Sequence, residues 1–126
     1  GATHRCMAAS DVLIVASGTA TMEATIVGTP MVVIYKTSAL TYLLARLLVE
    51  TPHISWPNIL VGKRIVPELL QDEAEPRAIA RLVLRMLENP SLYSEVRANL
   101  AEAGTRLGSP GALMRTARLI LEVART

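Results

Sequence analysis

A short polar turn between an apolar run and a helical pattern is the first candidate for chemistry. The run 11–16, Asp-Val-Leu-Ile-Val-Ala, ends at Ser17-Gly18-Thr19, and helical periodicity follows from residue 20. Ligands of open α/β sheets bind beyond the carboxyl ends of strands, and the first amides of a helix suit a diphosphate. Gly18 permits close approach to the backbone, whereas Ser17 and Thr19 add hydroxyl groups. The turn therefore predicts a phosphate-binding site.

Glu23 stands one helical turn beyond Thr19. A carboxylate there can accept both hydroxyls of a ribose, as acidic residues do in dinucleotide sites. The same residue types also suit an ordinary strand-to-helix turn, because Ser and Thr cap helices and Glu favours a first turn. Neither a Walker motif nor a Gly-x-Gly-x-x-Gly fingerprint is present at this turn. Residue types alone leave both interpretations open.

The second candidate is Asn58, in the loop-like segment Trp-Pro-Asn-Ile-Leu over 56–60. An Asn after Pro can present its amide to a sugar or a phosphate. Asn also commonly bonds the backbone of its own loop, and residue type alone favours that structural role. Asn58 is therefore kept as a candidate active-site residue whose role the segment does not define.

The remaining polar candidates are mostly basic. Lys36 follows an apolar run and is predicted at the carboxyl edge of a sheet, where it could contact phosphate. Lys63 and Arg64 form a basic pair that we expect in solvent, with phosphate contact as the alternative. His53 is expected to be a packed or surface histidine, because no orienting carboxylate can be identified for it, and His4 is a still weaker candidate.

These candidates need a scaffold, and the pattern predicts an α/β fold. The apolar runs 11–16 and 31–35 are typical of parallel strands buried on both faces, and a helix over 20–27 would join them in a right-handed βαβ unit. Residues 54–62 are predicted to be extended and loop, and residues 65–71 to form one or two helical turns. Two or three strands are few for a doubly wound sheet, so we expect a partial one.

Helical patterns dominate the rest of the chain. Residues 3–9 suit the end of a helix, and 39–49 suit a helix that is apolar nearly all round, with Ser38 as its N-cap. Further helices are predicted over 76–88, 92–106 and 110–124. We expect a partial Rossmann-like region over 1–75, followed by C-terminal helices over 76–126 that pack on it or on a partner.

Two of these helices have a clear apolar face. In the first, over 76–88, the apolar face is formed by Ile79, Leu82, Val83, Met86 and Leu87. In the second, over 92–106, the inward residues are Leu92, Val96, Leu100 and Ala103. A basic row on the first helix is predicted to face solvent, with contact to a membrane surface as its alternative: Arg77, Arg81 and Arg85.

Composition narrows the function classes. The chain has 126 residues, 51% of them apolar, and its formal charge is only +2. Aromatic residues make up 3%, so nucleic-acid binding on stacking platforms is poorly supported. The single cysteine, Cys6, allows no intrachain disulfide and is expected to be a small buried side chain in a helix. No apolar stretch reaches the roughly 18 residues of a membrane span, and no signal peptide is recognisable. The start at Gly1 suggests a fragment.

The chain resembles the lipid-A-disaccharide synthase family over about residues 3–124. The resemblance is carried by Ser-Asp-Val-Leu-Ile-Val-Ala-Ser-Gly-Thr-Ala-Thr-Met-Glu (10–23), Gly-Thr-Pro-Met-Val-Val-Ile-Tyr-Lys (28–36), Pro-Asn-Ile-Leu-Val-Gly (57–62) and Val-Pro-Glu-Leu-Leu-Gln (66–71). It implies a two-Rossmann-domain, inverting glycosyltransferase that uses no metal or other cofactor. The implied reaction transfers 2,3-diacylglucosamine from UDP to 2,3-diacylglucosamine 1-phosphate, forming lipid A disaccharide 1-phosphate and UDP.

The resemblance also implies roles for individual residues. Ser17, Gly18 and Thr19 would hold the UDP phosphates, Glu23 the ribose, and Asn58 would lie in the active site. With the positional candidates added, the predicted substrate-binding set is Ser17, Gly18, Thr19, Ala20, Glu23 and Lys36.

The family's setting is implied as well. Its members are peripheral to the cytoplasmic face of the inner membrane and form homodimers with exchanged C-terminal helices. The partners would be a UDP-sugar donor and a glycolipid acceptor. The family's N-terminal domain, with the acceptor site and the catalytic carboxylate, is absent from this sequence, as is a glycine-serine-arginine loop. The chain alone is therefore expected to be inactive, and its general base is not among these residues.

Two other functions stay open. Another UDP-sugar transferase or an epimerase of similar fold would share the turn, although the Pro-Asn-Ile-Leu segment argues against both. A helical interaction module would explain the apolar helix over 39–49 and the Arg-lined helix over 76–88.

Overall fold

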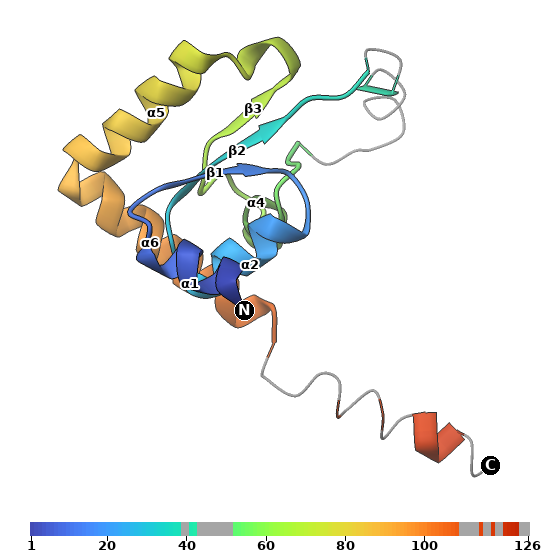
Figure 1. Ribbon diagram of the computed structural model, residues 1–126. Helices are drawn as coiled ribbons and strands as arrows, with labels where there is room; N and C mark the ends of the chain where they lie inside the picture. Colours follow the sequence, from blue (N-terminus) through green and yellow to red (C-terminus); the bar gives the residue numbers. More distant parts are fainter. Residues whose placement is uncertain (39–40, 43–51, 109–113, 115–116, 118–119, 124–126) are drawn as a thin grey trace.

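A three-stranded parallel sheet forms the centre of the molecule (Figure 1). The computed structural model describes residues 1–38, 41–42, 52–108, 114, 117 and 120–123. The strands lie in the order β1-β2-β3, which are Leu13–Ala16, Met31–Tyr35 and Glu68–Leu70. Helices lie on both faces of this sheet, so the prediction of an α/β fold with a partial parallel sheet is confirmed.

The first βαβ unit has the predicted layout. Helix α2, Thr19–Val27, joins β1 to β2, and the two strands pair in parallel with Ala16 opposite Ile34. Gly28 ends α2 in the left-handed conformation, at φ 78°, where glycine is favoured because it has no Cβ. Its amide donates to the Ala24 carbonyl at 2.9 Å. Strand β2 then begins within three residues, which fixes the carboxyl ends of β1 and β2 side by side.

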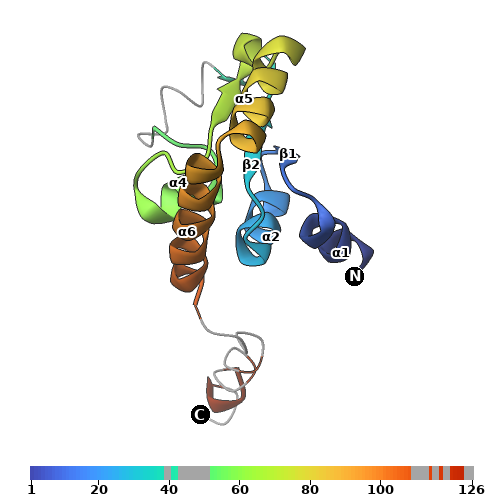
Figure 2. The ribbon, with the colours of Figure 1, turned by 90° about the vertical axis from the view of Figure 1, so that its left-hand side faces the viewer.

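An apolar cluster lies on each face of the sheet, and Figure 2 shows the helices around the sheet. On one face Met31 and Val33 pack with α1 (Ala2–Ala9), α2, α4 (Trp56–Val61) and α6 (Pro90–Arg106). On the other face Val32 packs with Met86 of α5 (Pro76–Glu88). Strand β2 is therefore buried on both sides, as its continuous apolar run predicts.

Strand β1 differs from its prediction. Ile14 lies opposite Val32 in the register, yet it is 56% exposed, whereas Val32 is fully buried. Helix α5 packs over β2 and β3 on this face and does not cover β1. The prediction of burial on both faces is therefore wrong for β1. Whether a face of this strand is buried depends on which helix covers it and not on the residue types of the strand.

Residues 54–71 also differ from their prediction. Residues 56–61 form helix α4, with Ser55 at the N-cap, Pro57 in the first turn and Gly62 in the left-handed conformation beyond the end. Residues 68–70, predicted as helical, instead form strand β3, which pairs in parallel with β2. A short 3₁₀ turn, η1 (Gln71–Glu73), follows it. The cap and proline positions were signals for a helix, whereas β3 is fixed by its neighbour in the sheet.

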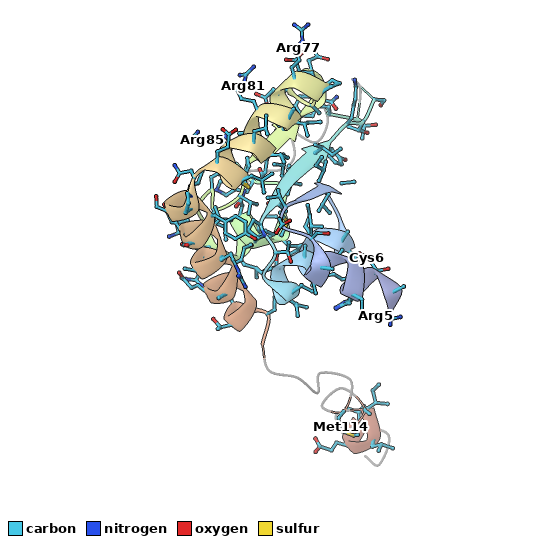
Figure 3. The ribbon with its side chains drawn as sticks, turned by 60° about the vertical axis from the view of Figure 1, so that its left-hand side comes forward. Arg5, Cys6, Arg77, Arg81, Arg85 and Met114 are labelled. Carbon is cyan, nitrogen blue, oxygen red and sulfur yellow. The ribbon has the colours of Figure 1, made fainter. Side chains whose placement is uncertain are left out.

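The later helices follow their periodicity closely. Helix α5 has the predicted bounds and buries Met86, but Leu87 is 49% exposed, contrary to the predicted inward face. The three arginines of α5 point away from the body (Figure 3), and all are exposed, as predicted. Helix α6 starts at Pro90, two residues before the prediction, because Asn89 caps it by accepting the Leu92 amide at 3.1 Å. Its inward residues include Leu100, which is fully buried.

Three further predictions have mixed outcomes. Cys6 lies in helix α1, but it is exposed, and Met7 is the buried residue of that helix. Ser38 is confirmed as an N-cap, because its hydroxyl accepts the Thr41 amide at 3.2 Å. The rest of the helix predicted over 39–49 lies outside the described residues, apart from 41–42, which are helical. Of 110–124, the described residues 114, 117 and 120–123 are helical. In the described part of the chain, no helix has the length and apolarity to cross a membrane.

Candidate functional site

The carboxyl ends of the three strands converge on one edge of the sheet. The Ser17 amide donates to the Ile34 carbonyl at 2.9 Å, which continues the β1–β2 pairing into the turn. Beyond β2, the backbone of Thr37 is held by Gln71, which follows β3: the Gln71 side chain accepts from the Thr37 amide at 2.8 Å and donates to its carbonyl at 2.9 Å. This edge is where ligands of open parallel sheets bind.

The turn after β1 leaves a free helix start at this edge. Gly18 has φ 150°, a value that side chains rarely adopt, and a Cβ built on it would meet nothing within 4 Å. The Thr21 amide and hydroxyl donate to the Gly18 carbonyl, at 3.0 Å and 2.7 Å. The amides of Thr19 and Ala20 then have no intrahelical partner. Open space, free amides and the positive end of the helix dipole together suit an anionic group.

The Ser17 hydroxyl has a partner within the protein. It donates to the Ile54 carbonyl at 2.9 Å, across 37 residues of sequence. A hydroxyl carries one hydrogen, so Ser17 cannot donate to a phosphate while this bond is made. Thr19 is exposed, and its hydroxyl is not used as a helix cap. The donors that remain available at this turn are therefore the Thr19 hydroxyl and the backbone amides, whereas the Ser17 hydroxyl ties the turn to Ile54.

Glu23 lies on α2 beside helix α1. Its carboxylate is 3.8 Å from His4 Nε2, and the two side chains are 37% and 49% exposed. No sequence signal joins His4 to Glu23, because the two residues meet only through the packing of α1 on α2. The described residues bring no three His, Cys, Asp or Glu side chains together as a metal-binding group.

Asn58 is fully buried within helix α4. Its Oδ1 accepts the amides of Ile65 and Val66, at 2.8 Å and 3.0 Å. Its Nδ2 donates to the Val66 carbonyl at 2.9 Å and to Glu68 Oε1 at 2.8 Å. The side chain thus has the backbone-binding role that its residue type favours. Its membership of the active site stays a prediction. In this structure its side chain joins α4 to Ile65, Val66 and Glu68.

Glu68 is a buried acid that the sequence reading missed, only 5% exposed on β3. Its Oε1 accepts from the Ser55 hydroxyl at 2.6 Å and the Ser55 amide at 2.9 Å. The Ile54 amide lies 3.3 Å from both carboxylate oxygens. An acid inside the apolar run Ile-Val-Pro-Glu-Leu-Leu over 65–70 was the available signal, because a buried carboxylate must be hydrogen-bonded.

The basic candidates separate in the structure. Lys36 is exposed directly after β2, at the sheet edge beside the turn, and Lys63 is exposed as expected. Arg64 does more than face solvent, because its Nη2 donates to the Glu68 carbonyl at 2.7 Å. Arg64 is nevertheless exposed, so the expectation of a solvated pair is confirmed, and its bond in addition anchors β3.

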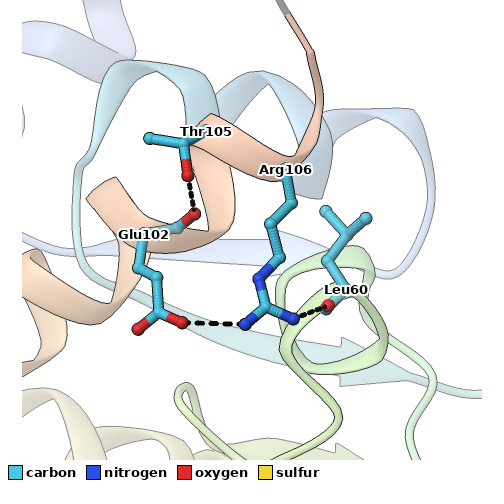
Figure 4. A network of polar contacts seen from close by, with 4 residues as sticks. All are labelled: Leu60, Glu102, Thr105 and Arg106. Carbon is cyan, nitrogen blue, oxygen red and sulfur yellow. Dashed lines mark hydrogen bonds and ion pairs between the residues drawn. The ribbon is translucent and has the colours of Figure 1, made fainter.

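Helix α6 holds the far end of α4 in place (Figure 4). Arg106 donates through Nη1 to the Leu60 carbonyl at 2.9 Å. Its Nη2 pairs with Glu102 Oε1 at 2.9 Å, one turn back on α6. Arg106 thus satisfies one of the carbonyls that the end of a helix leaves without an internal partner. Helix α4 is therefore held at its start by Glu68, through Ser55, and near its end by Arg106 of α6.

Comparison with known proteins identifies the family of the chain. A family model described as lipid-A-disaccharide synthetase matches residues 1–111. Proteins named lipid-A-disaccharide synthase are similar to the chain. The one from Syntrophus aciditrophicus is 42% identical over 99% of this chain and 33% of its own length, and that from Persephonella marina is 41% identical over 97% and 32%. The protein from Pseudomonas paraeruginosa is 48% identical over 75% and 25%. The chain thus spans about a third of the length of the curated relatives it matches. On this evidence, the chain belongs to the lipid-A-disaccharide synthetase family.

Proposed function

We propose that this chain is the part of a lipid-A-disaccharide synthase that binds the UDP-sugar donor. The observation that carries the proposal is the free start of α2 at the carboxyl edge of the sheet, with Gly18 at φ 150° and open space above it. The unpaired amides of Thr19 and Ala20 would bind the diphosphate, and Lys36 would add a positive charge from the next strand.

The proposed reaction needs a site that stabilises a departing diphosphate. A hydroxyl oxygen of 2,3-diacylglucosamine 1-phosphate attacks the anomeric carbon of UDP-2,3-diacylglucosamine, with inversion. The bond from that carbon to the diphosphate oxygen breaks, and UDP leaves with the electron pair. Fixed amide dipoles at the start of α2 would stabilise the charge that grows on the diphosphate. The base that takes the acceptor proton would be supplied from outside this chain.

Glu23 would bind the ribose of UDP, accepting both hydroxyls with its carboxylate. Glu23 lies four residues after Thr19 in α2, so the two side chains are on the same face of the helix. We therefore expect Glu23→Ala to weaken UDP binding by roughly 1–3 kcal/mol, the cost of losing a charged hydrogen-bond partner. Isothermal calorimetry of UDP with the chain, without added metal, measures this loss.

Glu102→Ala is the matched control for Glu23→Ala. Glu102 is also a helical carboxylate beside a basic side chain, but it pairs with Arg106 on α6. We expect this variant to bind UDP like the wild type. A folded wild-type chain that gives no binding heat would refute the proposed function, and equal affinity of Glu23→Ala and wild type would refute the ribose role.

The chain alone is expected not to transfer sugar, because the proposed acceptor site and general base lie outside it. Incubating the purified chain with both glycolipid substrates should give no disaccharide product by mass spectrometry. Product formation by residues 1–126 would contradict this hypothesis. In the full-length protein we propose a homodimer that pairs through its C-terminal helices at the cytoplasmic face of the inner membrane.

A helical interaction module is the second candidate function. Exposed apolar side chains support it, since Ile14 on β1 is 56% exposed, Leu84 on α5 is 52% exposed and Leu87 is 49% exposed. Such a module would self-associate without regard to UDP, and Glu23→Ala would leave its association constant unchanged. Analytical ultracentrifugation with and without UDP separates the two functions.

A further inference from the structure

We propose that Glu68 is a positioning residue for the turn that starts α2, acting through Ile54 and the Ser17 hydroxyl. The inference rests on the proposed function, because it assigns Glu68 to the UDP site, although the carboxylate is buried behind that site. It concerns the link between β3 and the turn after β1, which lie on opposite sides of β2 in the sheet.

The link passes through a single residue. The Ile54 amide donates to the Glu68 carboxylate at 3.3 Å, while the Ile54 carbonyl accepts from the Ser17 hydroxyl at 2.9 Å. Both polar groups of the Ile54 backbone are therefore held, one by Glu68 and one by the turn. Ser17 is held a second time by its own amide, which donates to Ile34. Any movement of Ile54 must change the geometry of the Ser17 hydroxyl bond.

The carboxylate is surrounded by neutral donors. Besides Ile54, it accepts from the Ser55 amide and hydroxyl and from Asn58 Nδ2, at 2.6 to 2.9 Å. Burying a carboxylate away from water costs free energy unless hydrogen-bond donors surround it. Hydrogen bonds to an ionised acceptor are also stronger than those between neutral groups. Glu68 therefore fixes the approach to α4 more tightly than a neutral side chain would.

Helix α4 begins without the side-chain capping bond that a serine can make. Ser55 is the N-cap residue, but its hydroxyl donates to Glu68 and its oxygen accepts no amide from the first turn of α4. A serine cap contributes about 1 kcal/mol to a helix. The local stability of α4 thus does not explain where the hydroxyl points, whereas a fixed Ile54–Ser55 backbone does.

Glu68→Gln tests the link with little change of shape. Gln can keep its oxygen at the Oε1 position, where Ser55 and Asn58 donate. The Ile54 amide, which is shared between both carboxylate oxygens at 3.3 Å, then keeps only that oxygen and meets an NH₂ donor in place of Oε2. We expect the backbone amide signals of Ser17 and Gly18 to shift in nuclear magnetic resonance spectra of the UDP-free chain. UDP affinity should fall about tenfold, or about 1.4 kcal/mol.

A double-mutant cycle shows whether the effect runs through Ser17. Ser17→Ala removes the hydroxyl bond to Ile54, so adding Glu68→Gln to it should weaken UDP binding little further. Additive losses would overturn the proposal. If Glu68→Gln fails to fold, Ser17→Ala tests the same link, because it removes the bond from the Ser17 hydroxyl to the Ile54 carbonyl. This variant should shift the amide signals of Ile54 and Ser55. Unchanged signals there would also overturn it.

Two controls separate positioning from a loss of stability. Thr29→Val removes another buried side-chain bond, the one to the Met7 carbonyl at 2.9 Å, just before β2 begins. Glu73→Gln repeats the charge loss at an exposed carboxylate that accepts the Leu70 amide. Both should leave UDP affinity and the Ser17 signals unchanged.

The outcomes also separate this inference from the proposed function. A Glu68→Gln chain that is less stable but keeps the wild-type Ser17 signals and UDP affinity would reduce Glu68 to a structural residue and overturn the inference. A folded wild type that ignores UDP would refute the proposed function. The amide signals would then still decide whether Glu68 positions the turn.

Discussion

Asn58→Ala is expected to lower the free energy of unfolding by about 4 kcal/mol or more, the summed cost of leaving several buried polar groups unpaired. The Asn58 side chain is fully buried, and it bonds the amides of Ile65 and Val66, the Val66 carbonyl and Glu68. Ile65 and Val66 are themselves buried, so water cannot easily replace the lost partners. Urea unfolding followed by circular dichroism measures the loss, with the change in midpoint read at a constant slope.

Asn89→Ala is the matched control for this prediction. Asn89 is exposed and caps α6 by accepting the Leu92 amide, so its loss should cost about 1 kcal/mol. The contrast tests burial, because both variants remove the same side chain, from a buried position in α4 and from an exposed cap of α6. Similar losses for the two variants, within about 1 kcal/mol of one another, would show that the network around Asn58 is not the support that its geometry indicates.

The parts of the fold that the sequence predicts well are those with local signals. The βαβ unit over 11–35 combines two β-branched runs with a helix ended by Gly28, and each boundary has its own residue type. Helix α5 is similar, because its apolar residues recur at helical spacing between Pro76 and Asn89. Only Leu87, at the edge of that face and near the end of the helix, departs from the pattern.

The segment over 54–71 shows where local signals fail. The run Ile-Leu-Val over 59–61 favours a strand by residue type, but it lies in α4, which Pro57 starts and Gly62 ends. The three residues of β3 carry too little pattern to identify a strand, and they become one because β2 offers an open edge with Val33 opposite Glu68. Pairing with β2 therefore decided β3, whereas the local proline and glycine signals of α4 outweighed its strand-like residue types.

The candidate site likewise has a part that local sequence predicts and a part that only the structure shows. The turn from Ser17 to Glu23 was found from residue types, because strand, Gly and helix start are adjacent in the chain. The partners of its side chains were not, since Ser17 meets Ile54 across 37 residues and Glu23 meets His4 through packing of α1 on α2. Residue type thus identified the donors available at the turn, whereas only the structure shows that the Ser17 hydroxyl is already engaged.

Gly18→Ala should weaken UDP binding by about 2 kcal/mol or more, roughly thirtyfold in Kd. At φ 150° a side chain is strained, so alanine would favour a different backbone at this position and turn the neighbouring amides away from the site. If the backbone stays in place, the new Cβ projects into the open space where the diphosphate is proposed to lie, since no protein atom lies within 4 Å of it. Both routes reduce affinity, and calorimetry with UDP measures the sum.

Gly28→Ala is the control that separates the ligand from the strain. Gly28 has φ 78°, and its added Cβ would also meet nothing within 4 Å, but it lies at the opposite end of α2. It should lower stability by about 1 kcal/mol or more, because a left-handed C-cap favours glycine, while UDP affinity stays at the wild-type value. If Gly28→Ala weakened UDP binding as much as Gly18→Ala, the loss would reflect a disturbed helix. If a folded Gly18→Ala chain bound UDP like the wild type, the diphosphate could not lie over this turn.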